Sequence, residues 1–368
     1  MQILVTGSKG FIGQNLVTEL LQSKSYTVDS FNRDDDASLL DSKIIQADAI
    51  IHLAGENRPT DEKEFERGNY QLTKKICQAV EKANKNIPII FSSSTQAEED
   101  SPYGKSKLAA ENVLFELSKK VGNLVTIYRL PGVFGKWSKP NYNSVVATFC
   151  HNIANQLPIQ INEPNKLLPL VYIDDVIKSF IKALHVSGKN QQWGKVEPIY
   201  SITIQELANQ LQLFYDSRQN LITERVGANL TRALYATYLS FLSPNQFTYD
   251  IPFFPDERGL FAEVLKTHDS GQFSFFTTLP GITRGQHFHH SKSEKFIIIK
   301  GKARFRFRHI LTNERFEIIT TSKNLKVVET IPGWVHDITN IGENEMIAML
   351  WANEVFDRNQ PDTISSEV

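Results

Sequence analysis

The stretch ILVTGSKGFIG, residues 3–13, joins a short apolar run to a turn with the spacing Gly-x-x-Gly-x-x-Gly. A buried strand, a tight glycine turn and a helix N-terminus together bind the pyrophosphate of a dinucleotide. Gly7 can adopt a backbone geometry that other residues avoid, Gly10 lets the chain approach the phosphates, and Gly13 lets helix and strand pack closely. The stretch therefore predicts an α/β fold and a dinucleotide cradle formed by Gly7, Gly10, Phe11, Ile12 and Gly13.

The rest of the N-terminal half repeats this alternation of strand and helix. Short apolar runs without polar alternation are typical of strands covered on both faces, and helix-period segments separate them. The runs are residues 3–5, 49–53, 87–91 and 125–128. Their alternation with helices predicts a doubly wound parallel sheet of Rossmann type.

The sequence pattern changes in the last third of the chain. Residues 205–242 have a helical pattern, and beyond Phe247 glycine and proline separate short β-forming runs such as 296–299 and 303–307. Such spacing is typical of an all-β sandwich or barrel. We therefore expect two domains, residues 1–243 and 244–368, which also suits a chain of 368 residues.

Composition excludes several classes of partner. The net charge is −1, and no run of lysine and arginine reaches five residues, so neither a nucleic acid nor an anionic membrane would find a basic face. The two cysteines follow no metal or redox spacing. Because the first residues lead directly into a strand pattern and no apolar stretch approaches 18 residues, we expect a cytoplasmic protein without a signal peptide.

The end of the second predicted strand, YTVDSFNRDD (26–35), bears on the choice of dinucleotide. An acidic residue there would hold a ribose 2′-hydroxyl, whereas an arginine would suit a 2′-phosphate. Arg33 occupies about this place, although Asp34, Asp35 and Asp36 follow it at once. The pattern favours NADP(H) over NAD; the alternative is a solvated charged loop.

A serine-rich strand end precedes a tyrosine and a lysine in FSSSTQAEEDSPYGKSK (91–107). Tyr103 and Lys107 are four residues apart and share one face of a helix. A lysine ammonium beside a phenol favours the phenolate and lowers the pKa of the phenol. The tyrosine could then exchange a proton with a carbonyl or alcohol that a serine hydroxyl holds.

With these pieces the N-terminal half resembles the extended short-chain dehydrogenase/reductase family. The matching motifs are TGSKGFIG, HLAG (52–55), GNYQLTKK (68–75), SSS (92–94), YGKSK (103–107), YRLPGVFG (128–135) and VYIDDV (171–176). The resemblance implies nicotinamide chemistry on nucleotide-activated sugars. It makes Tyr103 the acid/base, Lys107 its tuner and ribose anchor, and Ser94, or else Ser93, the carbonyl partner. It adds cofactor contacts at Leu53, Ala54, Gly55, Asn69 and Tyr103.

One departure from this family is a short connection. The usual insertion between the serine and the tyrosine is reduced to residues 95–102, so the choice of serine stays open.

The C-terminal third contains a second constellation, GITRGQHFHHSKSEKFIIIKG (281–301), followed by PGWVHDITN (332–340). His287 and His289 lie two apart on a predicted strand and point to one face. Glu294 and His336 join them only if the strands close into a barrel. Imidazole and carboxylate ligands suit Zn, Fe, Ni or Mn. The pattern predicts a cupin barrel whose metal ligands are His287, His289, Glu294 and His336, with His290 a surface residue.

The segment PDERGLFAEV (255–264) resembles the entry segment of cupin-fold epimerases that act on 4-keto-6-deoxy nucleotide sugars. The resemblance implies removal of the C3 proton, which the C4 ketone acidifies by spreading charge onto oxygen. A metal could stabilise that charge or only tie the barrel together, and both roles stay open. The base is not identified; His290, Lys295, Lys300 and several tyrosines remain candidates.

The two halves fit one substrate, because a 4-keto sugar nucleotide can be inverted at C3 and then reduced at C4. Beyond the motifs, the chain resembles bifunctional enzymes of capsular polysaccharide synthesis. The segments that carry this resemblance are residues 139–155, 234–243 and 353–363. It implies NADPH, Zn²⁺, a homodimer, a UDP-2-acetamido-2,6-dideoxy-L-arabino-hexos-4-ulose substrate, and UDP-2-acetamido-2,6-dideoxy-L-talose as product on the route to N-acetyl-L-fucosamine.

Two alternatives differ from this reading. One is an NADP(H)-sensing or scaffold protein with a structural cupin, although such proteins typically lose the Tyr/Lys pair that this chain keeps. The other is a dTDP-4-keto-6-deoxysugar reductase in which the barrel has no catalytic part.

Overall fold

The computed structural model describes residues 1–186, 188, 191–357 and 359–368. The chain divides into two compact units. The N-terminal unit comprises Met1–Leu211 and Arg232–Leu242, and the C-terminal unit comprises Gln212–Thr231 and Ser243–Val368. A functional domain boundary after residue 243 stays a prediction.

The N-terminal unit alternates strands and helices along the chain. Its elements are β1 Gln2–Thr6, α1 Phe11–Gln22, β2 Thr27–Phe31, α2 Leu39–Gln46, β3 Ala49–His52, α3 Lys63–Phe65, η1 Glu66–Gln71, α4 Leu72–Lys82, β4 Ile89–Ser94, η2 Thr95–Glu98, α5 Pro102–Val121, β5 Val125–Leu130, β6 Gly132–Phe134, α6 Val145–Ala154, β7 Leu167–Tyr172, α7 Ile173–Leu184, β8 Gln191–Trp193 and β9 Tyr200–Thr203. Helices α8 Ile204–Asn220 and α9 Asn229–Leu239 each contribute residues to both units.

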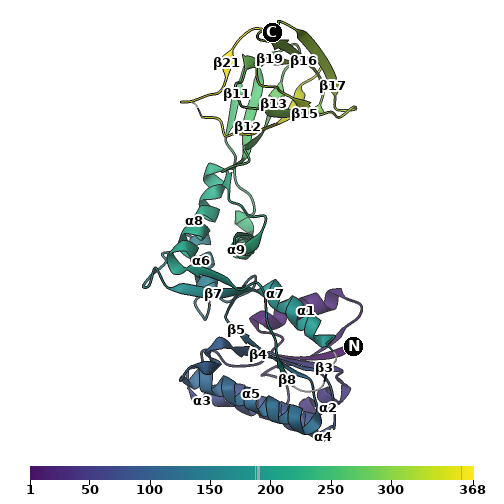
Figure 1. Ribbon diagram of the computed structural model, residues 1–368, viewed down its shortest axis with the longest axis vertical. Coiled ribbons are helices and arrows are strands. Elements are labelled where there is room, and N and C mark those ends of the chain that lie inside the picture. Colours follow the sequence, from purple (N-terminus) through teal and green to yellow (C-terminus); the bar gives the residue numbers. More distant parts are fainter. Residues whose placement is uncertain (187, 189–190, 358) are drawn as a thin grey trace. The chain divides into compact units, whose positions relative to one another are not determined.

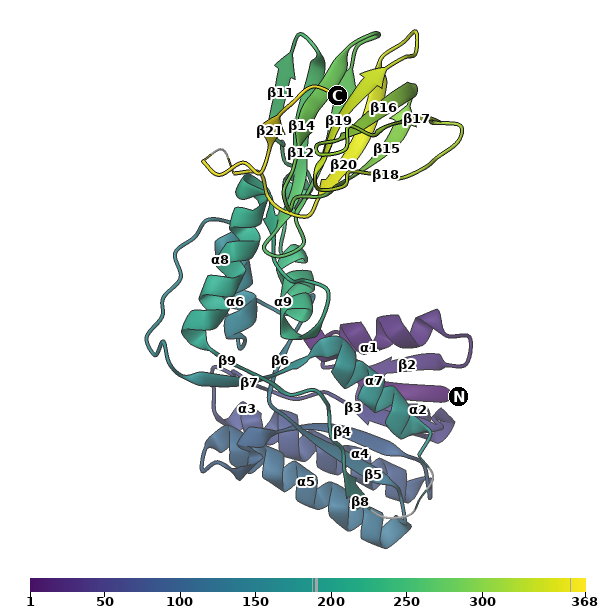
Figure 2. The same cartoon turned by 45° about the horizontal axis from the view of Figure 1, so that its top comes forward.

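A parallel sheet forms the centre of the N-terminal unit (Figure 2). Among the described residues it has six strands in the order β2-β1-β3-β4-β5-β8, and every neighbouring pair is parallel. The chain leaves β1 toward one edge and returns through β3 on the other side. The order therefore reverses between β1 and β3, and in open α/β sheets ligands bind where such a reversal occurs. The predicted parallel Rossmann-like sheet is confirmed.

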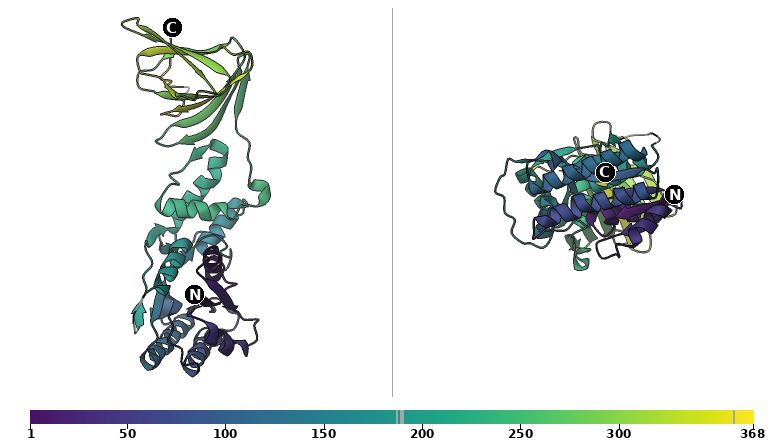
Figure 3. Two further views of the ribbon diagram at one scale, coloured as in Figure 1. Left: turned by 90° about the vertical axis from the view of Figure 1, so that its right-hand side faces the viewer. Right: turned by 90° about the horizontal axis from the view of Figure 1, so that it is seen from below.

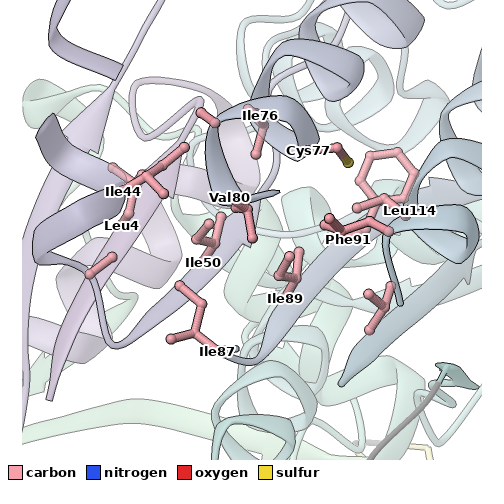
Figure 4. Close-up of a cluster of buried hydrophobic side chains, with 14 of the residues drawn as sticks. Leu4, Ile44, Ile50, Ile76, Cys77, Val80, Ile87, Ile89, Phe91 and Leu114 are labelled. Atoms are coloured by element: carbon pink, nitrogen blue, oxygen red, sulfur yellow. The ribbon is translucent and has the colours of Figure 1, made fainter. Parts of the chain in front are cut away.

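Helices cover both faces of this sheet because the strands are apolar on both sides. On one face, side chains from α2, α4 and α5 pack on the strands, as Figure 4 shows for Ile44, Ile76, Val80 and Leu114. Helices α4 and α5 lie side by side there (Figure 3, right). On the other face α1 and α7 bury their own apolar side chains. This packing fixes the carboxyl ends of the strands, which carry the predicted site.

The C-terminal unit is rich in β-structure (Figure 1). Its elements are β10 Ile222–Thr223, η3 Pro244–Gln246, β11 Phe253–Asp256, β12 Gly259–Thr267, β13 Gln272–Thr278, β14 Thr283–Phe288, β15 Glu294–Lys300, β16 Lys302–His309, β17 Arg315–Thr321, β18 Val328–Glu329, β19 Trp334–Asn340, β20 Met346–Ala352 and β21 Ile364–Ser365.

Among the described residues, the strands of this unit form two sheets. One has the order β10-β12-β13-β20-β15-β18, with β11 paired to β12, and the other has the order β17-β16-β19-β14-β21. Apolar side chains from both sheets share one core, with Phe296 and Ile298 from the first and Phe305 and Ile338 from the second. The β-rich fold is confirmed, whereas closure into a cupin barrel stays a prediction.

The helical pattern predicted over residues 205–242 is wrong in its middle. Helix α8 ends at Asn220, whose side chain accepts a hydrogen bond from the Ile222 backbone N–H, and Leu221 has a left-handed φ of 63°. The short strand β10 then pairs with β12 before α9 begins. Tertiary pairing thus overrides local helix preference.

Within the described residues, no helix is both long enough and apolar enough to cross a membrane.

Candidate functional site

The glycine turn lies where the order of the parallel sheet reverses. It follows β1, and the Gly7 N–H donates to the carbonyl of Phe31 at the end of β2 (2.9 Å). A side chain at Gly13 would begin 2.2 Å from the Gly7 carbonyl oxygen. Helix α1 begins after Gly10 without a side-chain cap, so its first N–H groups, on Phe11, Ile12 and Gly13, can meet an anion. This geometry fits the pyrophosphate of a dinucleotide.

The segment after β3 packs directly against this turn. Leu53 and Ala54 donate their N–H groups to the Thr6 carbonyl and hydroxyl, respectively, both at 3.2 Å. A side chain at Gly55 would begin 2.6 Å from the Asn69 amide oxygen and 3.4 Å from the Lys107 amine. The structure therefore brings the predicted cofactor residues 53–55 and Asn69 to one place beside Lys107.

Asn69 is buried within the π-helix η1, a rare geometry that often marks functional positions. Its side chain accepts from the Glu56 N–H (2.9 Å) and donates to the Ser106 hydroxyl (2.9 Å). These contacts join the end of β3 to α5, the helix that carries Tyr103 and Lys107.

Arg33 extends from the end of β2 with 73% of its side chain exposed, and it forms an ion pair with Glu56. Nearby, Asn32 accepts hydrogen bonds from the Ser8 hydroxyl (3.1 Å) and the Lys9 N–H (3.3 Å). Arg33 therefore follows β2 at the carboxyl end of the sheet, where the glycine turn also lies. Its role in reading a 2′-phosphate stays a prediction.

The tyrosine, serine and lysine meet at the carboxyl end of β4. The Ser94 hydroxyl lies close enough to the Tyr103 phenol to influence its pKa, and the Lys107 amine donates to the Ser92 carbonyl at 2.9 Å. Burial raises the pKa of Tyr103, and the neighbouring Ser94 hydroxyl opposes this rise only in part. Burial also lowers the pKa of Lys107 to about 8. The expected lowering of the tyrosine pKa by Lys107 is therefore not seen, because burial dominates.

Ser93, the fallback for the carbonyl partner, has a different contact. Its hydroxyl donates to the fully buried carboxylate of Glu111 at 2.5 Å, and Arg129 binds the same carboxylate at 2.7 Å. Sequence reasoning missed Glu111, although its position one helical turn after Lys107 was a usable signal. Ser94 is the serine in contact with the phenol, and its catalytic role stays a prediction.

The four predicted metal ligands converge in the C-terminal unit. One ligand atom from each of His287, His289, Glu294 and His336 lies within 4.8 Å of the others. The strands supply them because His287 pairs with His336 across β14 and β19. His289 lies one residue beyond the end of β14, and Glu294 begins β15.

A bulge in β14 determines the direction of the His287 side chain. The register with β19 shifts between Gly285 and His287, and both Gly285 and Gln286 have positive φ angles, 100° and 64°. A side chain at Gly285 would begin 2.9 Å from the His336 carbonyl oxygen, so only glycine allows this close approach. Bulges of this kind re-aim side chains next to functional sites.

The donor set fits a divalent metal. The Nε2 atoms of His287, His289 and His336 are buried and have no hydrogen-bond partner among the described residues. Those of His289 and His336 each lie 3.4 Å from Glu294 Oε2 without good hydrogen-bond geometry. Burial, and next the neighbouring His336, lower the pKa of His287 to about 4, so its imidazole is neutral at pH 7. Neutral imidazoles around a carboxylate are the ligands that zinc and related metals take.

A pocket of about 710 Å³ opens beside this cluster in the C-terminal unit. Its volume lies in the range of small-molecule sites. Its lining includes two cluster residues and several charged side chains, namely His287, Glu294, Asp256, Arg258, Glu263, Lys266, Arg284, Lys292 and Glu354. The exposed residues His290, Lys295 and Lys300, earlier candidates for the base, are not among the lining residues.

Glu263 and Lys266 form an ion pair on the pocket wall (2.7 Å), and less than a fifth of either side chain is exposed. Residues three apart on a regular strand face opposite ways. Here the β12 register shifts between Glu263 and Leu265, which brings both side chains to the pocket. Gln272 also donates to the Glu263 carboxylate (3.2 Å). Sequence reasoning missed this pair because periodicity does not reveal a bulge.

Two family models match the chain. Residues 3–194 match the NAD dependent epimerase/dehydratase family, and residues 254–364 match the polysaccharide biosynthesis C-terminal domain.

Whole-chain relatives are also similar. A UDP-2-acetamido-2,6-beta-L-arabino-hexul-4-ose reductase from Pseudomonas aeruginosa is 53% identical over 368 residues, which cover 100% of this chain and 99% of the relative. The crystal structure of the capsular polysaccharide assembling protein CapF from Staphylococcus aureus matches with a TM-score of 0.92 and 40% identity, covering 100% of both chains.

A UDP-glucuronic acid 4-epimerase from Bacillus cereus in complex with NAD matches 66% of this chain and 98% of its own, with a TM-score of 0.55 and 19% identity. At that identity it shows only a shared fold. The chain therefore belongs to the NAD dependent epimerase/dehydratase family, carries a polysaccharide biosynthesis C-terminal domain, and has the fold of CapF along its whole length.

Proposed function

We propose that this protein is a bifunctional nucleotide-sugar enzyme that inverts C3 and then reduces C4 of a UDP-linked 2-acetamido-2,6-dideoxy-L-arabino-hexos-4-ulose. The observation that carries the reductase assignment is the contact of Ser94 with Tyr103, one helical turn from Lys107 and next to a dinucleotide cradle. The name of the 53% identical relative supports the substrate class. The product would be the UDP-linked L-talose derivative, for capsular or surface polysaccharide.

For the reduction, the glycine turn would hold NADPH, which would supply a hydride to C4 of the sugar. Tyr103 donates its phenolic proton to the C4 oxygen as that oxygen gains charge. Because burial raises the pKa of Tyr103, the phenol is protonated at neutral pH and ready to donate. Ser94 holds the same oxygen by a hydrogen bond, and Lys107 stabilises the phenolate that remains.

For the inversion, the same ketone binds in the pocket of the C-terminal unit. In this proposal the two sheets of that unit form the predicted cupin. His287, His289, Glu294 and His336 would hold Zn²⁺ or another divalent metal, which supplies Lewis acidity or ties the strands together. Glu263 takes the C3 proton, leaving the electron pair delocalised onto the C4 oxygen. Lys266, paired with Glu263, stabilises that carboxylate before the proton leaves. A proton from solvent reaches C3 on the opposite face and completes the inversion, and Glu263 releases the proton it took to solvent.

The ketone explains why one chain combines both activities. It acidifies C3 for the first step, and the second step consumes it, so reduction fixes the inverted configuration. We also propose that the enzyme works as a homodimer.

Deuterium labelling tests the order and the presence of both steps. Incubated in D₂O without NADPH, the protein should exchange the C3 hydrogen of the UDP-keto sugar for deuterium. With NADPH, nicotinamide absorbance should fall, and the mass spectrum should show a C4-reduced product that carries the label at C3. Reduction without label would instead indicate a simple 4-keto reductase, and binding of NADPH without turnover would indicate a sensor or scaffold.

Glu263→Gln provides a second arm of this experiment. It keeps the size of the side chain but removes the base, so C3 exchange should be lost while reduction of a pre-inverted ketone persists. Glu257→Gln, at an exposed position that does not line the pocket, is the matched control.

Arg33→Ala should raise the KM for NADPH more than the KM for NADH. A hydrogen bond to a charged group contributes about 1.5–3 kcal/mol. Because the side chain is largely exposed, we expect the lower end, roughly a tenfold rise. Steady-state kinetics with both cofactors measure this ratio, and Arg67→Ala, an exposed arginine paired with Glu64, is the control. Equal effects on the two cofactors would reject a phosphate-reading role.

A further inference from the structure

The loop between β14 and β15 is held by a residue near the end of the chain. The carboxylate of Asp362 accepts the backbone N–H groups of three successive residues, His290 (2.8 Å), Ser291 (2.7 Å) and Lys292 (2.8 Å). The Ser291 hydroxyl also donates to it at 3.0 Å. Successive N–H groups that surround one anion fix the backbone of a loop. This loop is the direct link between two predicted metal ligands, His289 and Glu294.

The backbone of Asp362 makes a second contact, with His289 itself. The carbonyl oxygen of Asp362 accepts from Nδ1 of the His289 ring. A proton held on Nδ1 leaves the Nε2 lone pair free, and this nitrogen points toward Glu294. Partners of this kind set the tautomer and orientation of metal-binding histidines.

The chain that follows Asp362 is also held against the β-rich unit. Strand β21 pairs with β14, placing Ser365 opposite His287. The Ser366 N–H donates to the Gln286 carbonyl (3.0 Å), and Arg308 donates to the Ser366 hydroxyl (2.9 Å) and the Glu367 carbonyl (2.7 Å). Thr363 lines the pocket as well. The tail therefore contacts the segments that carry His287 and His289.

We propose that Asp362 is a positioning residue for the metal cluster, and that residues 362–366 act as a clasp that fixes His289 and the loop leading to Glu294. This inference rests on the proposed metal site. According to this inference, metal affinity depends in part on a tail that lies some 70 residues after His289 in the sequence.

Zinc binding by full-length variants tests the clasp. Asp362→Ala should weaken Zn²⁺ binding by roughly 10–100-fold, the range typical for loss of an outer contact to a ligand. Asp362→Asn, which keeps the shape but only one acceptor oxygen, should lie between this variant and the parent. The measurements are Kd by competition with a chelator of known affinity, and the visible absorption spectrum of the Co²⁺-loaded protein, which reports ligand geometry.

Asp357→Ala is the matched control, because this exposed tail carboxylate accepts only from the nearby Asn359 N–H in the described contacts. Its Kd should equal that of the parent. Denaturant unfolding of the metal-free proteins separates positioning from general stability, and the curves of the parent and the three variants should nearly coincide.

Equal Zn²⁺ affinity in Asp362→Ala and the parent would overturn the clasp while leaving the metal site in place. A loss of affinity that the metal-free unfolding free energy fully accounts for would also overturn it. If the parent itself binds no Zn²⁺ or Co²⁺, the metal site and the clasp both fail, whereas the reductase assignment is unaffected.

Discussion

Tyr103→Phe is expected to slow C4 reduction by about 10²–10⁴-fold, the usual contribution of a positioned acid or base. The variant removes only the phenolic oxygen, so the ring contact with Phe65 and the helix around it persist. Without the proton donor, charge that develops on the C4 oxygen keeps only the Ser94 hydrogen bond. The C3 exchange should continue at the parent's rate, because the proposed epimerase pocket belongs to the other unit.

Two assays on one sample separate these activities: loss of nicotinamide absorbance for reduction, and deuterium uptake for exchange. Tyr26→Phe, at a residue that contacts His185 away from the proposed site, is the control and should match the parent. Fluorescence titration should show that Tyr103→Phe still binds NADPH, because the glycine turn and Lys107 are unchanged. If Tyr103→Phe lost both activities, the two sites would not be separable, and if it kept full reduction, the acid role would be wrong.

His336→Ala is expected to weaken divalent-metal binding by more than the roughly 10–100-fold typical of losing an outer contact. It removes one of four converging ligand atoms and leaves buried space beside Glu294. The metal content of the purified protein, measured by mass spectrometry after dialysis against a weak chelator, should fall well below one ion per chain. Retention of full metal content would sink the ligand assignment.

His290→Ala is the matched control for this experiment. His290 is an exposed imidazole directly after His289, and its side chain lies outside the converging set. Metal content of this variant should equal that of the parent, which would separate the ligand from mere proximity to the site.

His336→Ala also distinguishes the two proposed roles of the metal, Lewis acidity and structural support. If Lewis acidity drives the inversion, His336→Ala loses C3 exchange while its unfolding midpoint stays near that of the metal-free parent. If the metal only ties the strands together, exchange persists in whatever fraction of the protein remains folded. Both assays should be run at a temperature well below the unfolding midpoint of the variant.

The sequence predicts the N-terminal unit well, because its signals are local. Uninterrupted apolar runs become β1, β3, β4 and β5, and the glycine turn stands between β1 and α1 as expected. What local patterns miss is the effect of burial. The spacing of Tyr103 and Lys107 suggests a lowered tyrosine pKa, yet desolvation raises it, and desolvation depends on packing from elements far away in the sequence.

In the C-terminal unit the histidine and carboxylate spacing predicts the four side chains that converge, His287, His289, Glu294 and His336, but not the residues that hold them in place. Asp362 binds the loop between β14 and β15 although the two are some 70 residues apart in the sequence, and no periodic pattern links them. Glu263 and Lys266 share a face only because the strand between them is irregular. Helix preference similarly failed at Leu221, where pairing with β12 competes with the helix.

The bulge at Gly285 and Gln286 has a consequence for protein engineering. Alternate side chains of a strand point to opposite faces of the sheet. Deleting one residue from β14 would therefore turn every side chain on one side of the deletion to the other face. His287 would turn outward while His336 kept its place on β19. Insertions or deletions in β14 should therefore be tolerated only in pairs, because the number of residues in the strand decides whether His287 faces His336.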